Sequence, residues 1–272
     1  MYEQYWELKE KPFQNTPDPH FFYHSRQHEE ALAKLTYAVK EGLGAGMLTG
    51  TFGCGKTVLG RVIIENLSAD VYKIAYINNP QLSYVDLLRS IVRHLKRVDL
   101  PQRLSELSTD YLLELLENIL TNNVRDGGET VIIVDEAHSI NNESVFDGLR
   151  MLLNFQLEDR FLLTLLLFGQ SELKDKIEDI KQLEQRIAVK CHIDALNREE
   201  AGEYIFHRLR MAGQERPLFT EEAIDLIHQR SGGIPRKINR LCDMSLLAGA
   251  HMEISIINRG IIEQEIKELI GE

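Results

Sequence analysis

The sequence predicts an α/β protein with a parallel sheet, followed by a smaller region that is all helical. Two observations carry this prediction. Short apolar runs alternate with helical patterns up to about residue 195, and only helical periods follow. Strands that alternate with helices favour a parallel sheet covered on both faces. We therefore expect an N-terminal segment (1–30), an α/β domain (31–195) and a helical domain (196–272).

Five apolar, partly β-branched runs are the expected strands of the sheet. They are AGMLT (45–49), VYKIAYI (71–77), TVIIVD (130–135), FLLTLLLF (161–168) and AVKCHI (188–193), and helical patterns such as 84–95 and 111–124 lie between them. In the helical domain, Thr220 before two glutamates predicts a helix start, and the pair Gly232–Gly233 predicts a helix end.

Composition narrows the function classes. The chain has 272 residues, 43% of them hydrophobic, which is enough for a sizeable core. A net charge of −11 argues against broad, non-specific binding to nucleic acid. Cys54, Cys191 and Cys242 are far apart, which suggests a reducing compartment rather than a disulfide frame or a zinc site. With no signal-peptide pattern and no apolar run near eighteen residues, we expect a cytoplasmic, soluble protein.

The stretch GTFGCGKT, residues 50–57, is named the phosphate loop below. It matches G-x-x-x-x-G-K-[ST] and lies between an expected strand and a helical pattern at 56–67, where such a loop cradles phosphates with its backbone N–H groups. Lys56 is expected to reach the β- and γ-phosphates of ATP, and the Thr57 hydroxyl to bind Mg²⁺. The alternative is a glycine-rich turn with an incidental lysine. The residues expected to bind the nucleotide here are Gly50, Thr51, Phe52, Gly53, Cys54, Gly55, Lys56, Thr57 and Val58.

A second motif, VIIVDEAHSI at 131–140, is an apolar strand that ends in two acidic residues. Next to a phosphate loop, Asp135 would bind Mg²⁺ and Glu136 would orient and deprotonate the attacking water. The alternative is a pair of solvated turn residues. The letters DEAH also occur in a helicase motif, but a helicase core needs a second similar domain, so His138 is interpreted as a packing or polar neighbour.

The chain resembles the AAA+ ATPases, and more narrowly the ATPase domain of the general secretion pathway protein A family. The resemblance covers nearly the whole chain and implies a five-stranded sheet in the order 5-1-4-3-2 with a C-terminal helical lid. It is carried by the opening MYEQYWELKEKPFQNTPDPHFFYHSRQHEEAL, NPQLS (79–83), VDEAHSI, LLLFGQSEL (165–173), LEQRIAVKCHI (183–193) and GGIPRKINRLC (232–242).

The resemblance implies roles for residues outside the two motifs. Gln170 matches sensor 1, which reads the γ-phosphate or the attacking water, although it could be an ordinary residue at a strand end. Arg186 matches the arginine finger that acts in a neighbouring subunit. It could instead form a surface salt bridge, and Arg150 is a rival for the finger. Arg236, after Pro235, matches sensor 2 on the lid.

The resemblance also raises expectations about adenine contacts, restraint of Glu136, the reactivity of Cys54 and recruitment to a membrane. Phe22 and Tyr23 could pack near adenine or in the core, and Asn78 or Asn79 could hold Glu136 inactive until a partner engages. Phe52 and Cys54 replace smaller or hydroxylic residues of relatives, which could make Cys54 reactive toward alkylation. Relatives often continue into a transmembrane helix, so with a last residue Glu272 we expect this chain to be recruited to the inner membrane by a partner.

These features favour an ATPase that forms homo-oligomers with ATP bound and supports assembly of a secretion, pilus or polysaccharide-export apparatus through a partner protein. The alternative is a DNA-associated ATPase of the transposition-helper or loader type, which the net charge disfavours. A nucleotide switch would normally continue into sensor repeats, and a small-molecule kinase would not need Glu136 as a base for water.

Overall fold

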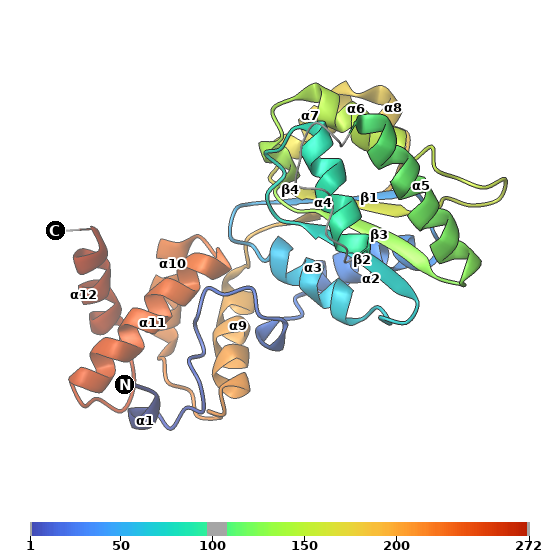
Figure 1. Cartoon of the computed structure of the whole chain (residues 1–272). Coiled ribbons are helices and arrows are strands. Elements are labelled where there is room, and N and C mark those ends of the chain that lie inside the picture. The colour runs from blue at the N-terminus through green and yellow to red at the C-terminus, as the bar shows by residue number, and fades with distance from the viewer. Residues whose placement is uncertain (1, 97–107, 271–272) are drawn as a thin grey trace. The chain divides into compact units, whose positions relative to one another are not determined.

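The computed structural model describes residues 2–96 and 108–270, and the chain falls into two compact units (Figure 1). Unit 1 contains residues up to 28, residues 51–58, and the chain from 194 onward. Unit 2 contains residues 29–50 and 59–193. The chain therefore passes from one unit to the other four times, because unit 1 is built from three stretches that are distant in sequence.

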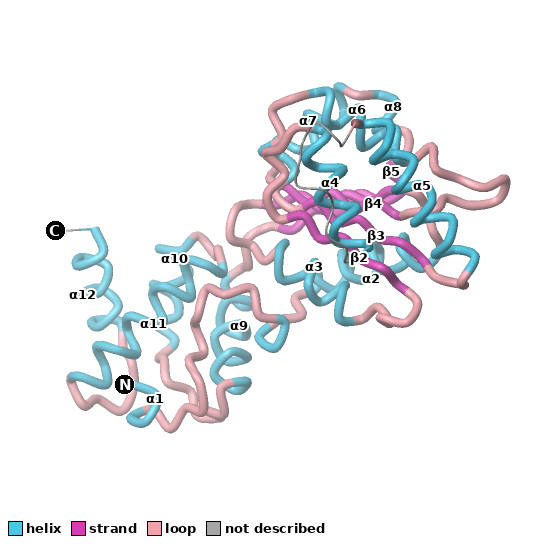
Figure 2. The backbone as a smooth tube through the Cα atoms, in the orientation of Figure 1, coloured by secondary structure: helices cyan, strands magenta, loops and turns pink. Residues whose placement is uncertain are grey.

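Unit 2 is built on a five-stranded sheet in which every neighbouring pair is parallel. The strands are the magenta segments of Figure 2. The strand order is β2-β3-β4-β1-β5, which confirms the expected order read from the opposite edge. All six residues of β4, which lies between β3 and β1, are buried, as its nearly continuous apolar run predicts for a central strand. The strands are β1 (Ala45–Gly50), β2 (Tyr72–Ile77), β3 (Glu129–Val134), β4 (Thr164–Gly169) and β5 (Ile187–Ile193).

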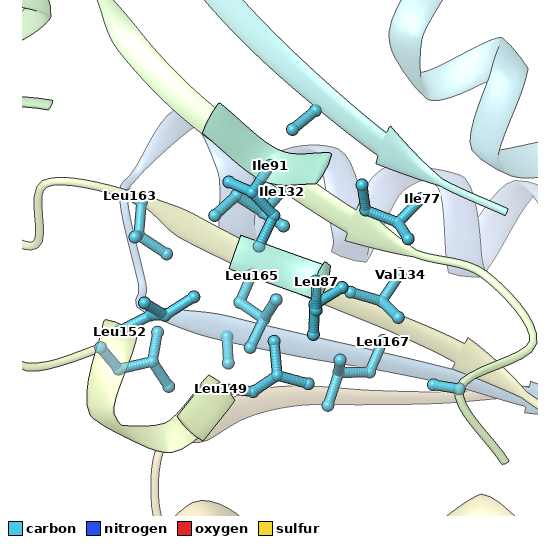
Figure 3. Close-up of a cluster of buried hydrophobic side chains, with 14 of the residues drawn as sticks. Ile77, Leu87, Ile91, Ile132, Val134, Leu149, Leu152, Leu163, Leu165 and Leu167 are labelled. Atoms are coloured by element: carbon cyan, nitrogen blue, oxygen red, sulfur yellow. The ribbon is translucent and has the colours of Figure 1, made fainter. Parts of the chain in front are cut away.

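Helices cover both faces of this sheet (Figure 1). On one face, Ile132, Leu165 and Leu167 pack against helix residues such as Leu87 and Leu149, and Figure 3 shows this apolar cluster. The helices of that face are α4 (Tyr84–Lys96), α5 (Thr109–Arg125), α6 (Glu143–Leu152), α7 (Glu172–Asp179) and α8 (Lys181–Glu184). The other face carries α2 (Arg26–Lys40) and α3 (Lys56–Glu65).

Unit 1 has a helical core made by α9 (Arg198–Met211), α10 (Glu221–Ser231), α11 (Pro235–His251) and α12 (Arg259–Ile270). Thr220 caps α10 by accepting a hydrogen bond from the backbone N–H of Ala223, and Gly232 ends it in the left-handed conformation. Both helix boundaries predicted from the sequence are therefore confirmed. Within the described ranges, no helix combines the length and the hydropathy that crossing a membrane requires.

The N-terminal arm, residues 2–28, belongs to the core of unit 1 and includes α1 (Tyr2–Tyr5) and the short 3-10 helix η1 (Pro19–Phe21). Trp6 and Phe13 are almost completely buried there. The Trp6 indole donates to the carbonyl of Leu246 at 2.8 Å, and Arg208 of α9 donates to the carbonyls of Pro12 and Gln14. The arm is thus fastened to the helices by backbone hydrogen bonds as well as by apolar contact.

Candidate functional site

The phosphate loop has the backbone that its glycines permit. It leaves β1 at Gly50 and enters α3 at Lys56, as predicted. Gly53 and Gly55 have φ values of 88° and 99°, which residues with a Cβ rarely adopt. The Lys56 ammonium donates to the carbonyl of Thr51 at 3.0 Å. Thr57 and Val58 lie in the first turn of α3, so the loop ends at a helix N-terminus that can receive an anion.

The N-terminal arm supports this loop through His28, which the sequence analysis did not single out. The Nε2 atom of His28 is 2.8 Å from the carbonyl oxygen of Cys54, and its Nδ1 atom is 2.7 Å from the Ser25 hydroxyl. Burial lowers the pKa of His28, so the neutral ring donates from Nε2 and accepts at Nδ1. The signal that could have revealed it is a histidine at the start of α2, within the distinctive opening segment.

Cys54 is fully buried, and burial raises the pKa of its thiol. Reaction with alkylating reagents requires an accessible thiolate. Both features oppose the reactivity toward alkylation that the sequence suggests.

Arg236 meets the loop within unit 1. Helix α11 begins at Pro235, and the backbone N–H of Arg236 donates to the carbonyl of Gly53 at 3.3 Å. Its guanidinium lies over the ring of Phe52, 4.9 Å from the ring centroid. A Cβ on Gly53 would lie 2.9 Å from the Cβ of Arg236, so only glycine allows this approach. The residue that resembles sensor 2 therefore contacts the loop through both its backbone and its side chain.

Phe22 and Tyr23 occupy different surroundings in the same unit. Phe22 is buried and stands edge-on to the rings of His24 and His28, at centroid distances of 4.8 and 5.8 Å. The Tyr23 hydroxyl donates to Glu203 of α9, and burial raises the pKa of Tyr23. Tyr23 is therefore engaged in packing against α9, whereas Phe22 lies next to the histidine that supports the phosphate loop.

In unit 2, the acidic pair directly follows β3. Asp135 is buried, and its two oxygens accept hydrogen bonds from the Glu136 backbone N–H at 2.9 Å and from the Tyr76 hydroxyl at 2.7 Å. Finding Tyr76 from the sequence would require both the neighbouring positions of β2 and β3 and their register, in which Tyr76 is opposite Ile133. Glu136 adopts a left-handed backbone conformation, φ 55°, a strained geometry typical of functional turns.

The side chain of Glu136 faces His138. The His138 Nε2 atom is 3.6 Å from a carboxylate oxygen of Glu136 and 2.8 Å from the amide of Gln170, which follows β4. Gln170 therefore shares a neighbour with Glu136, and His138 is a polar neighbour of the acidic pair, one of the two alternatives expected from the sequence. Asn78 and Asn79, which were suggested to restrain Glu136, lie exposed after β2.

The two candidate finger arginines make contacts within their own chain. Arg186, just before β5, donates to the carbonyl of Leu153 at 2.7 Å and to the side-chain oxygen of Asn154 at 2.8 Å. The Nε atom of Arg150 lies 3.5 Å from a carboxylate oxygen of Asp147.

Strand topology places the carboxyl ends of three strands at one edge of the sheet. β1, β3 and β4 run parallel with Thr49 opposite Gly169 and Val134 opposite Leu167. The phosphate loop, the acidic pair and Gln170 each follow one of these strand ends. In parallel α/β sheets, ligands bind outside this edge.

The donors present suit magnesium better than zinc. A threonine hydroxyl such as that of Thr57 and a carboxylate such as that of Asp135 are hard oxygen ligands, the kind that Mg²⁺ takes together with several waters and phosphate oxygens. Throughout the described part of the chain, there is no group of three or more His, Cys, Asp or Glu side chains that could hold a metal by themselves.

Comparison with known proteins decides the family. A family model described as an AAA domain matches residues 39–177, about half of the chain. The chain belongs to the AAA domain family. The chain is also 37% identical over 250 residues to general secretion pathway protein A of Aeromonas hydrophila. This alignment covers 91% of the chain and 45% of that protein. The chain thus spans less than half the length of this curated relative.

Solved structures support the fold of the AAA protein. The Drosophila ORC bound to DNA aligns with a TM-score of 0.73 at 17% identity, covering 99% of this chain and 66% of that one. The Aeropyrum pernix ORC2 protein, solved as ADPNP and ADP complexes, aligns with a TM-score of 0.68 at 20% identity, covering 92% and 70%. At these identities the likeness concerns the fold alone.

Proposed function

We propose that this AAA protein hydrolyses ATP and uses the energy, as a nucleotide-dependent homo-oligomer, to support assembly of a secretion, pilus or polysaccharide-export apparatus through a partner protein. The observation that carries the ATPase part is the phosphate loop itself, with Gly53 and Gly55 in the left-handed region and α3 starting at Lys56. The pathway part is supported by the 37% identity to general secretion pathway protein A.

In this proposal, the loop N–H groups and Lys56 bind the β- and γ-phosphates of ATP. Bound Mg²⁺, held by Thr57 and Asp135, would neutralise phosphate charge during the reaction. Glu136 takes a proton from water as the water oxygen forms a bond to the γ-phosphorus and the bond from that phosphorus to the β,γ-bridging oxygen breaks. The products are ADP and phosphate, and Gln170 orients the attacking water.

Two further parts of the proposal concern assembly. Arg186 acts as a finger in the site of a neighbouring copy, where its planar cation stabilises charge in the transition state. Its position immediately before β5, the last strand at one edge of the sheet, supports this role, with Arg150 as the rival. The family relation supports recruitment of the protein to the inner membrane by its partner.

The test begins with phosphate release from ATP by the purified protein, with Mg²⁺ present. Lys56→Ala should abolish tight ATP binding, because it removes the cation that meets the phosphates, whereas Glu136→Gln should bind ATP and lose turnover. Wild-type affinity in Lys56→Ala would overturn the assignment of the loop.

Double-stranded DNA, added in a parallel series, distinguishes the assembly function from a DNA-associated one. We expect no stimulation by DNA, because the net charge of −11 opposes phosphate contacts. Strong stimulation of ATP turnover by DNA would favour the alternative.

A further inference from the structure

We propose that His138 is a positioning residue for ATP hydrolysis: its single N–H orients Gln170 and, by exchange, Glu136. This inference rests on the proposed ATPase function, in which Glu136 is the base and Gln170 orients the water. His138 belongs to the 3-10 helix η3 (Ala137–Ser139), between the acidic pair and α6.

The backbone that carries His138 is held firmly. The Lys176 ammonium, from α7, donates to the carbonyls of His138 and Ile140 at 2.5 and 2.8 Å. A Cβ added to Gly169, at the end of β4, would lie 3.1 Å from the His138 backbone nitrogen, so η3 lies close against that strand end. These contacts fix the backbone position of His138 close to Gln170, which follows Gly169 in the chain.

The surroundings of the ring identify the nitrogen that carries the proton. Nδ1 is buried and has no hydrogen-bond partner among the residues that the structure describes. A buried N–H without an acceptor is rarer in proteins than an unpaired acceptor. Nε2, in contrast, lies 2.8 Å from the Gln170 amide and 3.6 Å from the Glu136 carboxylate. The Gln170 atom at 2.8 Å is the amide nitrogen, which only donates. We place the proton on Nε2 and turn the amide by half a rotation, so that its oxygen takes the place of the nitrogen and accepts.

With Nδ1 buried and without an acceptor, the ring has one N–H, on Nε2, and can make only one of these two hydrogen bonds well at a time. With the Gln170 amide turned, the 2.8 Å contact is a hydrogen bond from Nε2, whereas at 3.6 Å the bond to Glu136 is not formed. In this arrangement Gln170 is oriented and the carboxylate of Glu136 is left able to accept a proton. If the ring turned its N–H from Gln170 to Glu136, Gln170 would lose its hydrogen bond and the Glu136 carboxylate would gain one. The position of one ring therefore affects two of the groups that the reaction needs.

The test compares three substitutions of His138 in the full chain. A glutamine places its amide nitrogen near the position of Nε2, whereas an asparagine is shorter and places it near Nδ1. We expect His138→Ala and His138→Asn to lower kcat by about 10- to 100-fold, the scale of a misplaced catalytic group. The KM for ATP should change less than threefold, and His138→Gln should recover most of kcat. The control is His94→Ala, on the exposed surface of α4.

A second measurement tests the coupling to Gln170. If His138 acts through Gln170, the fold-decrease in kcat of the double variant His138→Ala with Gln170→Ala should be much smaller than the product of the fold-decreases of the two single variants. Binding of a non-hydrolysable ATP analogue, measured on each variant, should match wild type.

The outcomes separate this inference from the function on which it rests. A wild-type protein no more active than Lys56→Ala would refute the proposed ATPase. An active wild type with an equally active His138→Ala, or equal kcat for the glutamine and asparagine variants, would refute the role of Nε2. If His138→Ala fails to fold, the comparison of glutamine with asparagine still decides the question.

Discussion

The buried arginine of α9, Arg208, should be a main anchor of the N-terminal arm. Its Nε atom donates to the carbonyl of Pro12 and its Nη2 atom to that of Gln14 at 3.1 Å, while its Nη1 atom donates to the Tyr204 hydroxyl at 2.9 Å. The guanidinium also lies 4.6 Å from the centroid of the Phe21 ring. The substitution Arg208→Met keeps the apolar stem in place and removes all of the donors.

The expected loss of stability follows from these contacts. Two backbone carbonyls lose a charged donor, and each such hydrogen bond contributes about 1.5–3 kcal/mol. Because the carbonyls can partly recover water when the arm loosens, we take the lower end, about 3 kcal/mol in total. With a typical urea dependence of roughly 1–3 kcal/mol per M, the unfolding midpoint should fall by about 1–3 M.

The chain supplies its own probe. Trp6 is the single tryptophan, it is buried in unit 1, and it lies in the arm that Arg208 holds. Its fluorescence during urea titration therefore reports release of the arm. Arg210→Met, an exposed position on the same helix, is the matched control and should leave the midpoint unchanged. A midpoint for Arg208→Met within about 0.3 M of wild type would refute the reasoning.

Three other predictions concern the phosphate loop and assembly. Phe52→Ala should tighten ATP binding two- to fivefold, as measured by calorimetry, because the contact of the Arg236 guanidinium with the Phe52 ring, worth about 0.5–1 kcal/mol, no longer holds Arg236 there. Weaker ATP binding by this variant would show that the contact does not compete with nucleotide. Glu136→Gln and Arg186→Ala should each be inactive, yet mixing them should restore phosphate release if a finger from one copy completes the site of another, and a proven mixed oligomer without activity would contradict this. Cys54 should react slowly with a maleimide at pH 7 even without ATP, because a raised pKa leaves less thiolate; rapid labelling of the native protein would contradict the buried position, and denaturation in urea provides the positive control.

The sheet could be predicted almost completely from the sequence because its strands are buried and apolar. The expected run 45–49 became Ala45–Gly50, and 188–193 became Ile187–Ile193. The run 161–168 was less accurate, since the strand spans Thr164–Gly169. Phe161 instead forms an isolated antiparallel bridge with Gln156, and apolar character alone does not distinguish such a bridge from the start of a strand.

Side-chain partners in the candidate site were harder to predict, because they depend on elements that are distant in sequence. The acidic pair was found from its position after a strand, but its link to Tyr76 requires the pairing of β2 with β3. His28 supports the phosphate loop from 26 residues before Cys54, so its place in the opening segment could draw attention to it, but the contact itself depends on how the chain folds. His138 was predicted only as a packing or polar neighbour of the site, because its contact with Gln170 depends on how the end of β4 lies against η3.

The three-part construction of unit 1 has a consequence for biosynthesis. Trp6 leaves the ribosome about 240 residues before Leu246, the residue whose carbonyl its indole meets, and at 5–20 residues per second the wait is on the order of 10–50 s. During that time the aromatic side chains of the arm have no α11 to pack against, whereas the strands of unit 2 are already complete when residue 193 has been made. The arm is thus made long before the helices that it packs against, and these contacts of high sequence separation are expected to form late in folding.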